Sequence, residues 1–262
     1  LEKYAVFIDE KSLNAVPIHL KIDTGMHRLG FEFDEAEALC NVLKNNPALQ
    51  VKSVFSHLAG SGSAEHDAFT FHQFNTFKEV CKLLENALGY SFIKHISNTS
   101  AISRWPEMQL DMVRLGIGLY GIDAATGQEN NSLQPVASLK TSISQLKKVK
   151  AGETVGYSRN DVMEKDGTIA TVRIGYADGY LRVFGNGNGK MLINGKLVPT
   201  IGHISMDMCM LDVSEIDVQE DDTVIVFNED LRIETLADQA DTIPYEILTN
   251  ISQRVKRVYF YE

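Results

Sequence analysis

The chain has 262 residues, of which 44% are hydrophobic and 23% charged, as in a globular protein with one large or two medium domains. Its net charge of -10 argues against nucleic acid as a partner, because phosphates attract a basic surface. It shows no membrane-length apolar run and no signal-peptide pattern, and its three cysteines lack CxxC spacing, so we expect a reduced cytoplasmic protein without a disulfide framework or zinc site.

The first half of the chain alternates short apolar runs with helical patterns. The strand candidates are Pro17–Asp23, Val51–Leu58, Phe92–Ser97 and Met112–Tyr120. The helix candidates are Asp34–Asn45, with Asp34 as its N-cap, Phe69–Leu88 and Ser100–Trp105. Strands that alternate with helices predict a parallel sheet covered by helices.

The composition changes at Asp123–Pro135, a polar, turn-rich segment that we interpret as the linker between a domain at 1–130 and another at 131–262. Asn-Gly pairs at 186–187 and 194–195 are hairpin signals. The other predicted elements are strands near residues 141–149, 168–174, 190–198, 208–213 and 222–227, a helix over Arg232–Ile251 and a closing strand over 255–261. This half is therefore expected to be mostly antiparallel β.

The number of strands in the first half bears on its architecture. One strand–helix unit of an eight-stranded (β/α) barrel takes about 30 residues, and the first half supplies only four candidate strands. If the fold is that barrel, the rest of it would lie upstream. An open half barrel would leave unpaired strand edges, which proteins normally cover, so we expect a truncated chain or a partner fragment.

Two motifs resemble a known family. Lys21–Gly30 reads KIDTGMHRLG and Arg114–Gly121 reads RLGIGLYG, and together they resemble the barrel domain of alanine racemase, which uses pyridoxal 5′-phosphate (PLP). The resemblance runs from about Pro17 to the C-terminus. It implies the C-terminal half of a (β/α)8 barrel followed by a mostly antiparallel β domain. The motifs GYADGY, HISMDM and PYEILTNISQRVKRVY also resemble the racemase portion of ligase–racemase fusion proteins.

One family element is absent from this sequence. The family carries its PLP-binding lysine in a segment similar to VKANAYGHG, and no such segment occurs here. The resemblance implies that the intact protein interconverts L- and D-alanine, which supplies D-alanine for peptidoglycan, and that these 262 residues alone do not. One alternative is a non-catalytic module that dimerises through its β domain, and another is a racemase for serine or lysine.

The resemblance places the cofactor-binding residues at strand ends, where barrel enzymes have their active sites. Arg114 matches the arginine that faces the pyridine nitrogen of PLP, and the amides of Gly116 and Ile117 match those that hold its phosphate. Asn98-Thr99 matches the other phosphate-binding segment, with threonine in place of the usual serine. The remaining cofactor residues are His57, beside the ring, and Tyr245, near the phosphate. Alone, each would more often be structural.

The resemblance also implies catalytic and substrate-binding roles. Arg28 resembles the arginine that contacts the phenolic oxygen of PLP and the substrate carboxylate, and Lys21 matches a lysine, often carbamylated, that orients it. Racemisation needs a group on each face of Cα, and Tyr157 resembles the base opposite the PLP lysine. The other substrate contacts are Tyr176, Met206 and Asp207. In the family these residues and the tyrosine base reach the other subunit's site, which implies a homodimer.

Two positions depart from the family pattern in the corridor that leads to the site. His203 stands where the family often has the arginine of GRxxMD, and Gly62 lies near the place of an acidic residue. Both bear on substrate preference. The histidines at 57, 66 and 72 suggest a metal cluster at first sight, but their spacing does not match a helical ligand pair, so we expect no metal site.

Overall fold

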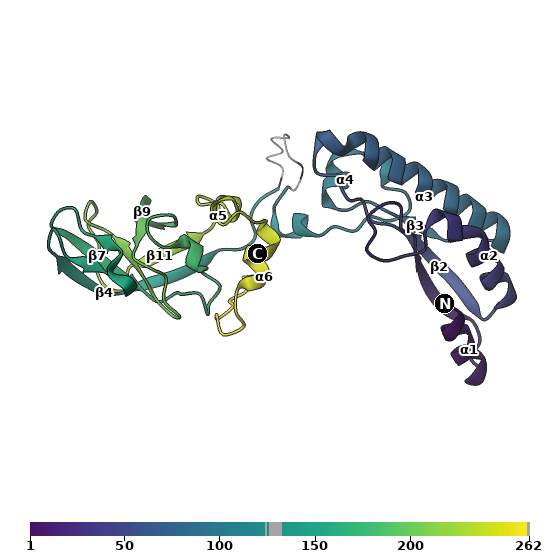
Figure 1. Ribbon diagram of the computed structural model, residues 1–262, viewed down its shortest axis with the longest axis horizontal. Helices are drawn as coiled ribbons and strands as arrows, with labels where there is room; N and C mark the ends of the chain where they lie inside the picture. The colour runs from purple at the N-terminus through teal and green to yellow at the C-terminus, as the bar shows by residue number, and fades with distance from the viewer. Residues whose placement is uncertain (124, 126–132, 261–262) are drawn as a thin grey trace. The chain divides into compact units, whose positions relative to one another are not determined.

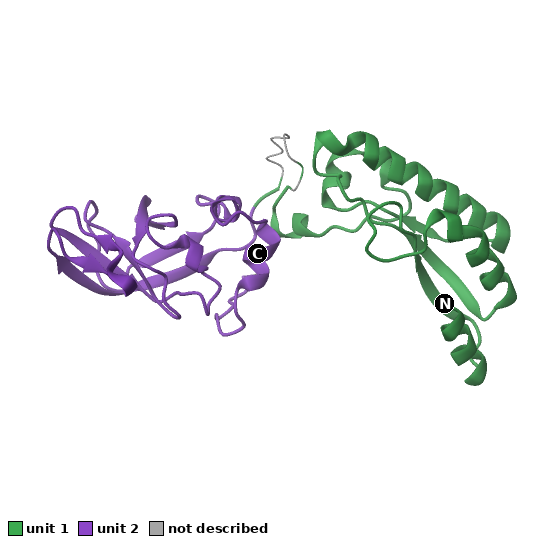
Figure 2. Ribbon diagram, in the orientation of Figure 1, with its two compact units in different colours: residues 1–134 green, residues 135–262 purple. Residues whose placement is uncertain are grey.

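The computed structural model of the protein describes residues 1–123, 125 and 133–260. The chain divides into two compact units, residues 1–134 and 135–262 (Figure 1, Figure 2). The predicted boundary after residue 130 and most of the predicted linker Asp123–Pro135 lie outside the described residues. None of the helices in the described part of the chain has the length and apolar character needed to cross a bilayer.

Unit 1 is built on a parallel sheet of three strands in the order β1-β2-β3. These strands are β1 (Val16–Lys21), β2 (Leu49–Phe55) and β3 (Ile93–His95). The helices α2 (Ala36–Asn45) and α3 (Asp67–Leu88) cover one face of the sheet (Figure 1). The prediction of a parallel sheet covered by helices is confirmed.

Side chains along the strands of unit 1 alternate between two faces. One face packs into the core with the helices through residues that include Ile18, Leu20, Val54, Ile96, Leu39, Leu43, Phe74, Phe77 and Leu84. Strand periodicity turns the intervening His19, Ser53 and His95 to the opposite face. The sheet of unit 1 thus has an apolar helix-covered face and a face that carries polar groups.

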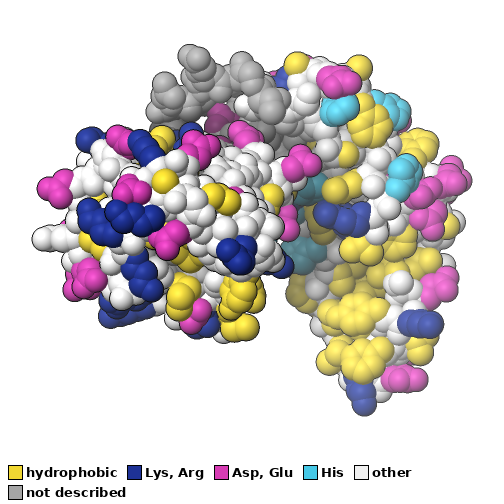
Figure 3. All heavy atoms as spheres, turned by 60° about the vertical axis from the view of Figure 1, so that its left-hand side comes forward, with side chains coloured by type: hydrophobic (Ala, Val, Ile, Leu, Met, Phe, Trp, Pro, Cys, Tyr) yellow, Lys and Arg dark blue, Asp and Glu magenta, His cyan; other side chains and the backbone are white. Residues whose placement is uncertain are grey.

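Shorter helices complete unit 1. They are α1 (Glu2–Glu10), α4 (Thr99–Arg104) and the 3-10 helices η1 (Phe33–Glu35), η2 (Ala64–His66), η3 (Pro106–Met108) and η4 (Ile117–Tyr120). Ala5 and Ile8 of α1 join the core, whereas Tyr4, Val6 and Phe7 are exposed. Hydrophobic side chains accordingly gather at the bottom of unit 1 in Figure 3, where α1 lies. The helix α1 is therefore apolar on both sides.

Two predictions for unit 1 are wrong. The segment Met112–Tyr120 is not a strand: Arg114 donates its amide hydrogen bond to the Ser97 carbonyl at 3.0 Å, and η4 takes the rest of the segment. A positive φ of 50° at Leu110 turns the chain just before this segment. Asp34 is not an N-cap either, because Glu32 caps the 3-10 turn that precedes α2, in a capping box with Glu35.

Unit 2 is a closed antiparallel barrel of six strands in the order β10-β7-β4-β11-β8-β9. The strands are β4 (Leu139–Val149), β7 (Gly167–Val172), β8 (Lys190–Ile193), β9 (Lys196–Ile201), β10 (Cys209–Asp212) and β11 (Thr223–Phe227). A small ladder pairs β5 (Thr154–Val155) with β6 (Asp161–Val162), across the 3-10 helix η5 (Tyr157–Arg159). The predicted antiparallel β half is confirmed.

One of the two predicted hairpins is present. Asn194 and Gly195, with φ of 49° and 75°, connect β8 to β9. Asn186 and Gly187 also have positive φ, but they follow the 3-10 helix η6 (Arg182–Phe184) and do not join two paired strands, so that hairpin prediction is wrong. The same dipeptide favours the turn in both places, and the flanking residues decide what it connects.

The C-terminal prediction of one long helix is wrong. The segment forms two helices, α5 (Ile233–Gln239) and α6 (Pro244–Asn250). Asp241 has a positive φ of 51°, and Pro244 has no N–H with which to continue the preceding helix. The predicted closing strand is also wrong, because residues 255–260 are in no strand, while residues 261–262 lie outside the described residues.

Candidate active site

The loop after β1 is organised by one buried carboxylate. Asp23 Oδ1 accepts hydrogen bonds from the amides of Gly25, Met26 and His27, and Oδ2 accepts one from the amide of Arg28, all at 2.8–3.1 Å. Burial of Asp23 favours the neutral acid, but these backbone bonds outweigh it and lower the pKa of the carboxyl. The carboxylate therefore holds the segment that carries Arg28 at the C-terminal end of β1.

The loop after β2 is held by a buried glutamine of α3. Gln73 Oε1 accepts from the amide of Ala59 at 2.9 Å, and its Nε2 donates to the carbonyl of His57 and to Thr24 Oγ1, both at 3.2 Å. The Thr24 hydroxyl also contacts Ser56 Oγ at 2.9 Å. Gln73 thus connects the loop after β1 to the loop after β2 through its side-chain hydrogen bonds.

Arg114 is held by acceptors from the ends of β2 and β3. Its Nη1 donates to His95 Nδ1 at 2.8 Å and to the His95 carbonyl, and its Nη2 donates to the carbonyls of Ser56 at 2.6 Å and Ile96 at 3.2 Å. The guanidinium also lies over the Phe55 ring, 5.6 Å from its centroid. Among the described residues, Nε–H is the guanidinium donor to which no acceptor is assigned.

His57 lies in a cationic environment. Its Nδ1 is 3.4 Å from Arg114 Nη2. Burial lowers the pKa of His57, and the charges of Arg114, Arg28 and Lys21 lower it further. The structure thus brings His57 to Arg114, and the surrounding positive charge favours the neutral imidazole. Arg28 itself is exposed, and Lys21 is half-buried.

The loop after β3 forms a small polar cradle. Thr99 Oγ1 accepts from the amides of Gly116 at 3.0 Å and Gly118 at 3.3 Å. Asn98 Oδ1 caps α4 by accepting from the amide of Ala101, so Asn98 shapes the cradle and its side chain is engaged within the protein. A Cβ at Gly118 would lie only 2.6 Å from the Leu115 side chain, which shows how closely the loop approaches its neighbours.

This constellation fits an anionic aromatic group such as PLP. Backbone amides and a hydroxyl at a loop suit a phosphate, and the half-buried Arg114 guanidinium offers a donor to a ring nitrogen. Arg114, Thr99 and the amides of Gly116 and Ile117 are the residues that would hold it. In the described residues, no group of three or more His, Cys, Asp or Glu side chains is arranged to hold a metal ion.

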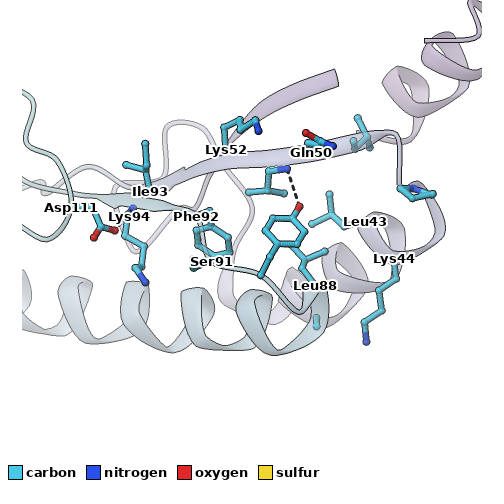
Figure 4. Close-up of a pocket in the computed structure, with 15 residues that line it drawn as sticks. Leu43, Lys44, Gln50, Lys52, Leu88, Ser91, Phe92, Ile93, Lys94 and Asp111 are labelled. Carbon is cyan, nitrogen blue, oxygen red and sulfur yellow. Dashed lines mark hydrogen bonds between the residues drawn. The ribbon is translucent and has the colours of Figure 1, made fainter. Parts of the chain in front are cut away.

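A separate groove of about 910 Å³ lies at the other ends of the same strands (Figure 4). It is lined by the starts of β2 and β3, including Lys52, Phe92 and Ile93. The Tyr90 hydroxyl in this groove accepts a hydrogen bond from the Val51 amide at 3.1 Å. Because barrel enzymes place catalysis at the C-terminal ends of their strands, this groove is not the candidate active site.

The remaining predicted residues lie in unit 2 and are exposed. Tyr157 is 70% exposed on η5, in a turn where Ser158 and Arg159 both have positive φ. Two side chains connect this turn to the loop after β9. Asn160 Nδ2 lies 3.1 Å from His203 Nε2, and Asp161 Oδ2 accepts a hydrogen bond from the Gly202 amide. Tyr176, Met206, Asp207 and Tyr245 are also exposed.

Backbone bonds join two of these segments: the Tyr176 amide donates to the Ser205 carbonyl at 3.0 Å, and the Ala177 amide donates to the Met206 carbonyl at 2.9 Å. A Cβ at Gly175 would meet the backbone of this neighbouring segment at 2.3 Å. The first glycine of GYADGY is therefore required by the close approach of these two segments. Tyr176 and Met206 are thus carried by adjoining segments.

Sequence reasoning missed four residues that organise this region. They are Asp23, Gln73, His95 and Ser53. Asp23 stands inside the motif KIDTGMHRLG two residues after β1, and His95 is the last residue of β3, three residues before Asn98, so the position of each near a strand end was a usable signal. Gln73 carried a weaker signal, a polar residue within the apolar stripe of a long helix.

Comparison with known proteins covers almost the whole chain. Residues 3–124 match the family model of the alanine racemase N-terminal domain, and residues 136–259 match that of the alanine racemase C-terminal domain. The chain is 40% identical to an alanine racemase of Clostridium tetani over 95% of the chain and 66% of the relative. It is 36% identical to alanine racemase 1 of Caldanaerobacter subterraneus over 99% of the chain and 69% of the relative. The chain thus spans about two thirds of these relatives.

Solved structures of alanine racemases are also similar to this chain. A crystal structure of alanine racemase from Bartonella henselae with covalently bound pyridoxal phosphate superposes with a TM-score of 0.89 at 31% identity, covering 99% of the chain and 70% of that structure. An alanine racemase from a D-cycloserine-producing Streptomyces lavendulae gives 0.90 at 30% identity, covering 100% and 70%. They confirm the predicted fold class, a partial (β/α) barrel followed by a mostly antiparallel β domain.

Proposed function

The chain belongs to the alanine racemase family, and from this we propose that the protein binds PLP and interconverts L- and D-alanine. The observation that carries the proposal is the cradle at the ends of the parallel strands. Arg114 is fixed by four acceptors there, beside a hydroxyl–amide pocket formed by Thr99 and Gly116. Such a pocket suits a phosphorylated aromatic cofactor. Unit 1 would then be the cofactor-binding part of the protein.

PLP, when bound, draws electrons from the substrate Cα so that its proton can leave. Arg114 would donate a hydrogen bond to the ring nitrogen without giving it a proton, because a guanidinium holds its proton at all ordinary pH. The ring then stays a weaker electron sink, which favours proton exchange over transamination. His57, kept neutral by burial and by three neighbouring cations, would lie beside the ring without adding positive charge.

Two chain segments would handle the substrate in this proposal. Arg28, at the end of the loop that Asp23 organises, would bind the substrate carboxylate with its guanidinium fork, and Lys21 would orient it. Tyr157 would exchange the Cα proton on one face. In the family a lysine serves the other face, and it belongs to the part of the relatives that these residues do not span. We therefore propose that residues 1–262 alone do not racemise alanine.

The exposed residues of unit 2 support a homodimer with composite sites. Tyr157, Tyr176, Met206 and Asp207 are accessible on unit 2 and would complete the partner's site, while Tyr245 would reach the phosphate. Backbone contacts hold Tyr176 and Met206 on adjoining segments, as a shared substrate wall requires. We place the protein in the cytoplasm, where its three buried free cysteines would stay reduced and its product would serve peptidoglycan synthesis.

The test is a measurement on the protein expressed from its complete reading frame. Intact mass, PLP absorbance and racemisation of L-alanine would be recorded, followed by borohydride reduction and mapping of the labelled lysine. We expect bound PLP, racemase activity and a label on one lysine. A protein that binds no PLP would overturn the proposal and would favour a non-catalytic dimerisation module. A clear preference for serine or lysine would change the substrate.

A further inference from the structure

Polar side chains occupy one layer of the unit 1 sheet that faces away from the helices. His19 of β1, Ser53 of β2 and His95 of β3 lie on this face, while the adjacent Leu20, Val54 and Ile96 belong to the apolar core. Barrel interiors are normally filled by branched apolar side chains. Two histidines and a serine at such positions are therefore unusual and suggest a functional role. We call these three residues the His19–Ser53–His95 relay.

The relay is continuous and ends at Arg114. His19 Nδ1 lies 2.6 Å from Ser53 Oγ, and Ser53 Oγ lies 3.2 Å from His95 Nε2. The other ring nitrogen of His95, Nδ1, lies 2.8 Å from Arg114 Nη1. The register places His19 directly opposite Ser53 in the sheet, so the backbone brings the first pair together.

The chemistry of arginine fixes the tautomer of His95. A guanidinium only donates, so His95 Nδ1 must be the acceptor, and the proton of the neutral ring sits on Nε2. His95 Nε2–H then donates to Ser53 Oγ. When His19 Nδ1 carries no proton, the Ser53 hydroxyl donates to it, and each hydrogen bond then runs from Arg114 toward the exposed His19.

The surroundings of His95 support this assignment. His95 and Ser53 are buried, and the Phe55 ring stacks on His95 at a centroid distance of 5.1 Å with an interplanar angle of 4°. Burial, together with the charges of Arg114 and His19, lowers the pKa of His95 to about 4. The ring is thus neutral near pH 7 and can accept from Arg114. Stacking fixes the ring plane, and Ser53 fixes which nitrogen carries the proton.

We propose that Ser53 and His19 are positioning residues, which hold His95 in its Nε2–H form and thereby fix the Arg114 guanidinium, whose Nε–H would then serve the ring nitrogen of PLP. The proposal rests on the proposed function for the identity of the ring, but the tautomer itself does not depend on it. With the Nδ1–H form, two donors would face each other at 2.8 Å and the guanidinium would have to turn away.

The first test is nitrogen NMR of the purified full-length protein with labelled histidines and without PLP. In the wild type, the His95 ring should show a single Nε2–H tautomer. Ser53→Ala should give a mixture of tautomers or exchange broadening, and Ser53→Thr, which keeps the hydroxyl, should restore the single form. A wild-type Nδ1–H ring, or an unchanged His95 spectrum in Ser53→Ala, would overturn the proposal.

Two further variants separate a relay from a simple packing effect. Ser97→Ala removes another buried serine hydroxyl beside Arg114, one that donates to the Met108 carbonyl at 2.7 Å, and it should leave the His95 tautomer unchanged. His19→Phe removes the last acceptor and should perturb the His95 ring although the two side chains are not bonded. His19→Asn offers an acceptor near the position of Nδ1 and should rescue it. An unchanged His95 spectrum in His19→Phe would limit the positioning role to Ser53 and contradict the relay.

A second readout uses the PLP-loaded protein. Ser53→Ala should weaken PLP binding by about fivefold, as expected for one net hydrogen bond, and should lower kcat equally in both directions because Arg114 serves both. The two failures are distinguishable. A wild type that binds no PLP but shows the Nε2–H tautomer would refute the proposed function alone, whereas a PLP-binding wild type with no change in Ser53→Ala by NMR or binding would refute this inference alone.

Discussion

Single side chains with several partners define the candidate site. Arg114 contacts residues at the ends of two strands, and Asp23 collects four backbone amides from its own loop. Asp23 is buried and Arg114 is half-buried, and in both cases the hydrogen bonds offset the cost of desolvation. These groups therefore fix the backbone around them, which a solvated charge would not do.

Tyr157 supplies the first test at this scale. Tyr157→Phe in the full-length protein should lower kcat by about 100-fold or more, because it removes a proton-transfer group from one face of Cα. Since the equilibrium constant between the enantiomers is one, kcat/KM must fall equally in both directions. The asymmetry should instead appear in kcat and in the α-deuterium isotope effect, measured from each enantiomer.

The matched control is Tyr90→Phe, which removes a hydroxyl from the groove at the opposite ends of the strands (Figure 4). It should leave kcat and the isotope effects unchanged. Negligible and equal effects of Tyr157→Phe on the two enantiomers would count against its assignment as a base.

Asp23 supplies the second test. Asp23→Asn should lower the free energy of unfolding at pH 7 by about 1–3 kcal/mol, because the charged acceptor of four amides becomes a neutral amide. The folded-state pKa of Asp23 lies below its ordinary value of 3.8. The stabilisation is therefore present above that value and is lost as the pH falls through the folded pKa.

Urea unfolding at pH 7 and pH 3 measures this effect. The difference between wild type and Asp23→Asn should be smaller at pH 3, and an equal difference at both pH values would refute the assignment. Asp34→Asn is the control, since Asp34 is exposed and caps no helix, and it should change the unfolding free energy by less than about 0.5 kcal/mol.

At the scale of elements, periodicity predicted the sheet of unit 1 and the strands of unit 2 because buried positions repeat along them. It failed where a local bond or backbone angle decided the outcome. RLGIGLYG is as apolar as a strand, yet it becomes a loop and η4 because Thr99 binds the amides of Gly116 and Gly118. The late helix breaks at Pro244, a signal that the sequence did contain.

Only those residues of the candidate site that lie in recognisable motifs could be predicted from the sequence. Arg114, Thr99, Gly116 and His57 were found through resemblance, and the structure brings His57 to Arg114 and Thr99 to Gly116. Ser53 and Gln73 were not found, because a polar residue in a strand or helix is usually solvated. Only the pairing of distant segments shows that these two are buried and bonded.

Helix α3 gives the element-scale test, since Gln73 ties it to two strand-end loops. Gln73→Leu keeps the volume but leaves the Ala59 amide without its acceptor, so unfolding free energy should fall by about 1–3 kcal/mol. The Ala59 amide should also exchange its hydrogen faster. Glu79→Leu, at an exposed position of the same helix, should change neither quantity appreciably. Unchanged protection of Ala59 in Gln73→Leu would contradict the role given to the glutamine.

At the scale of the whole molecule, the proposed chemistry is divided between the units. Arg28, His57, Thr99 and Arg114 belong to unit 1, whereas Tyr157 lies in unit 2 on an exposed turn. The proposed homodimer, with sites made from unit 1 of one subunit and unit 2 of its partner, would account for a catalytic tyrosine that is exposed on a single chain. Such an arrangement can be tested by mixing subunits.

Full-length Arg114→Gln and Tyr157→Phe proteins should each be nearly inactive, and refolding them together should restore activity. In a mixed dimer with composite sites, one site receives both substitutions and the other receives neither. Random pairing of equal amounts should therefore recover about a quarter of wild-type activity. Different affinity tags on the two variants would verify that mixed dimers form. Mixed dimers without recovered activity would mean that each site is built within one chain, and Tyr157 would then have to act on its own Arg114.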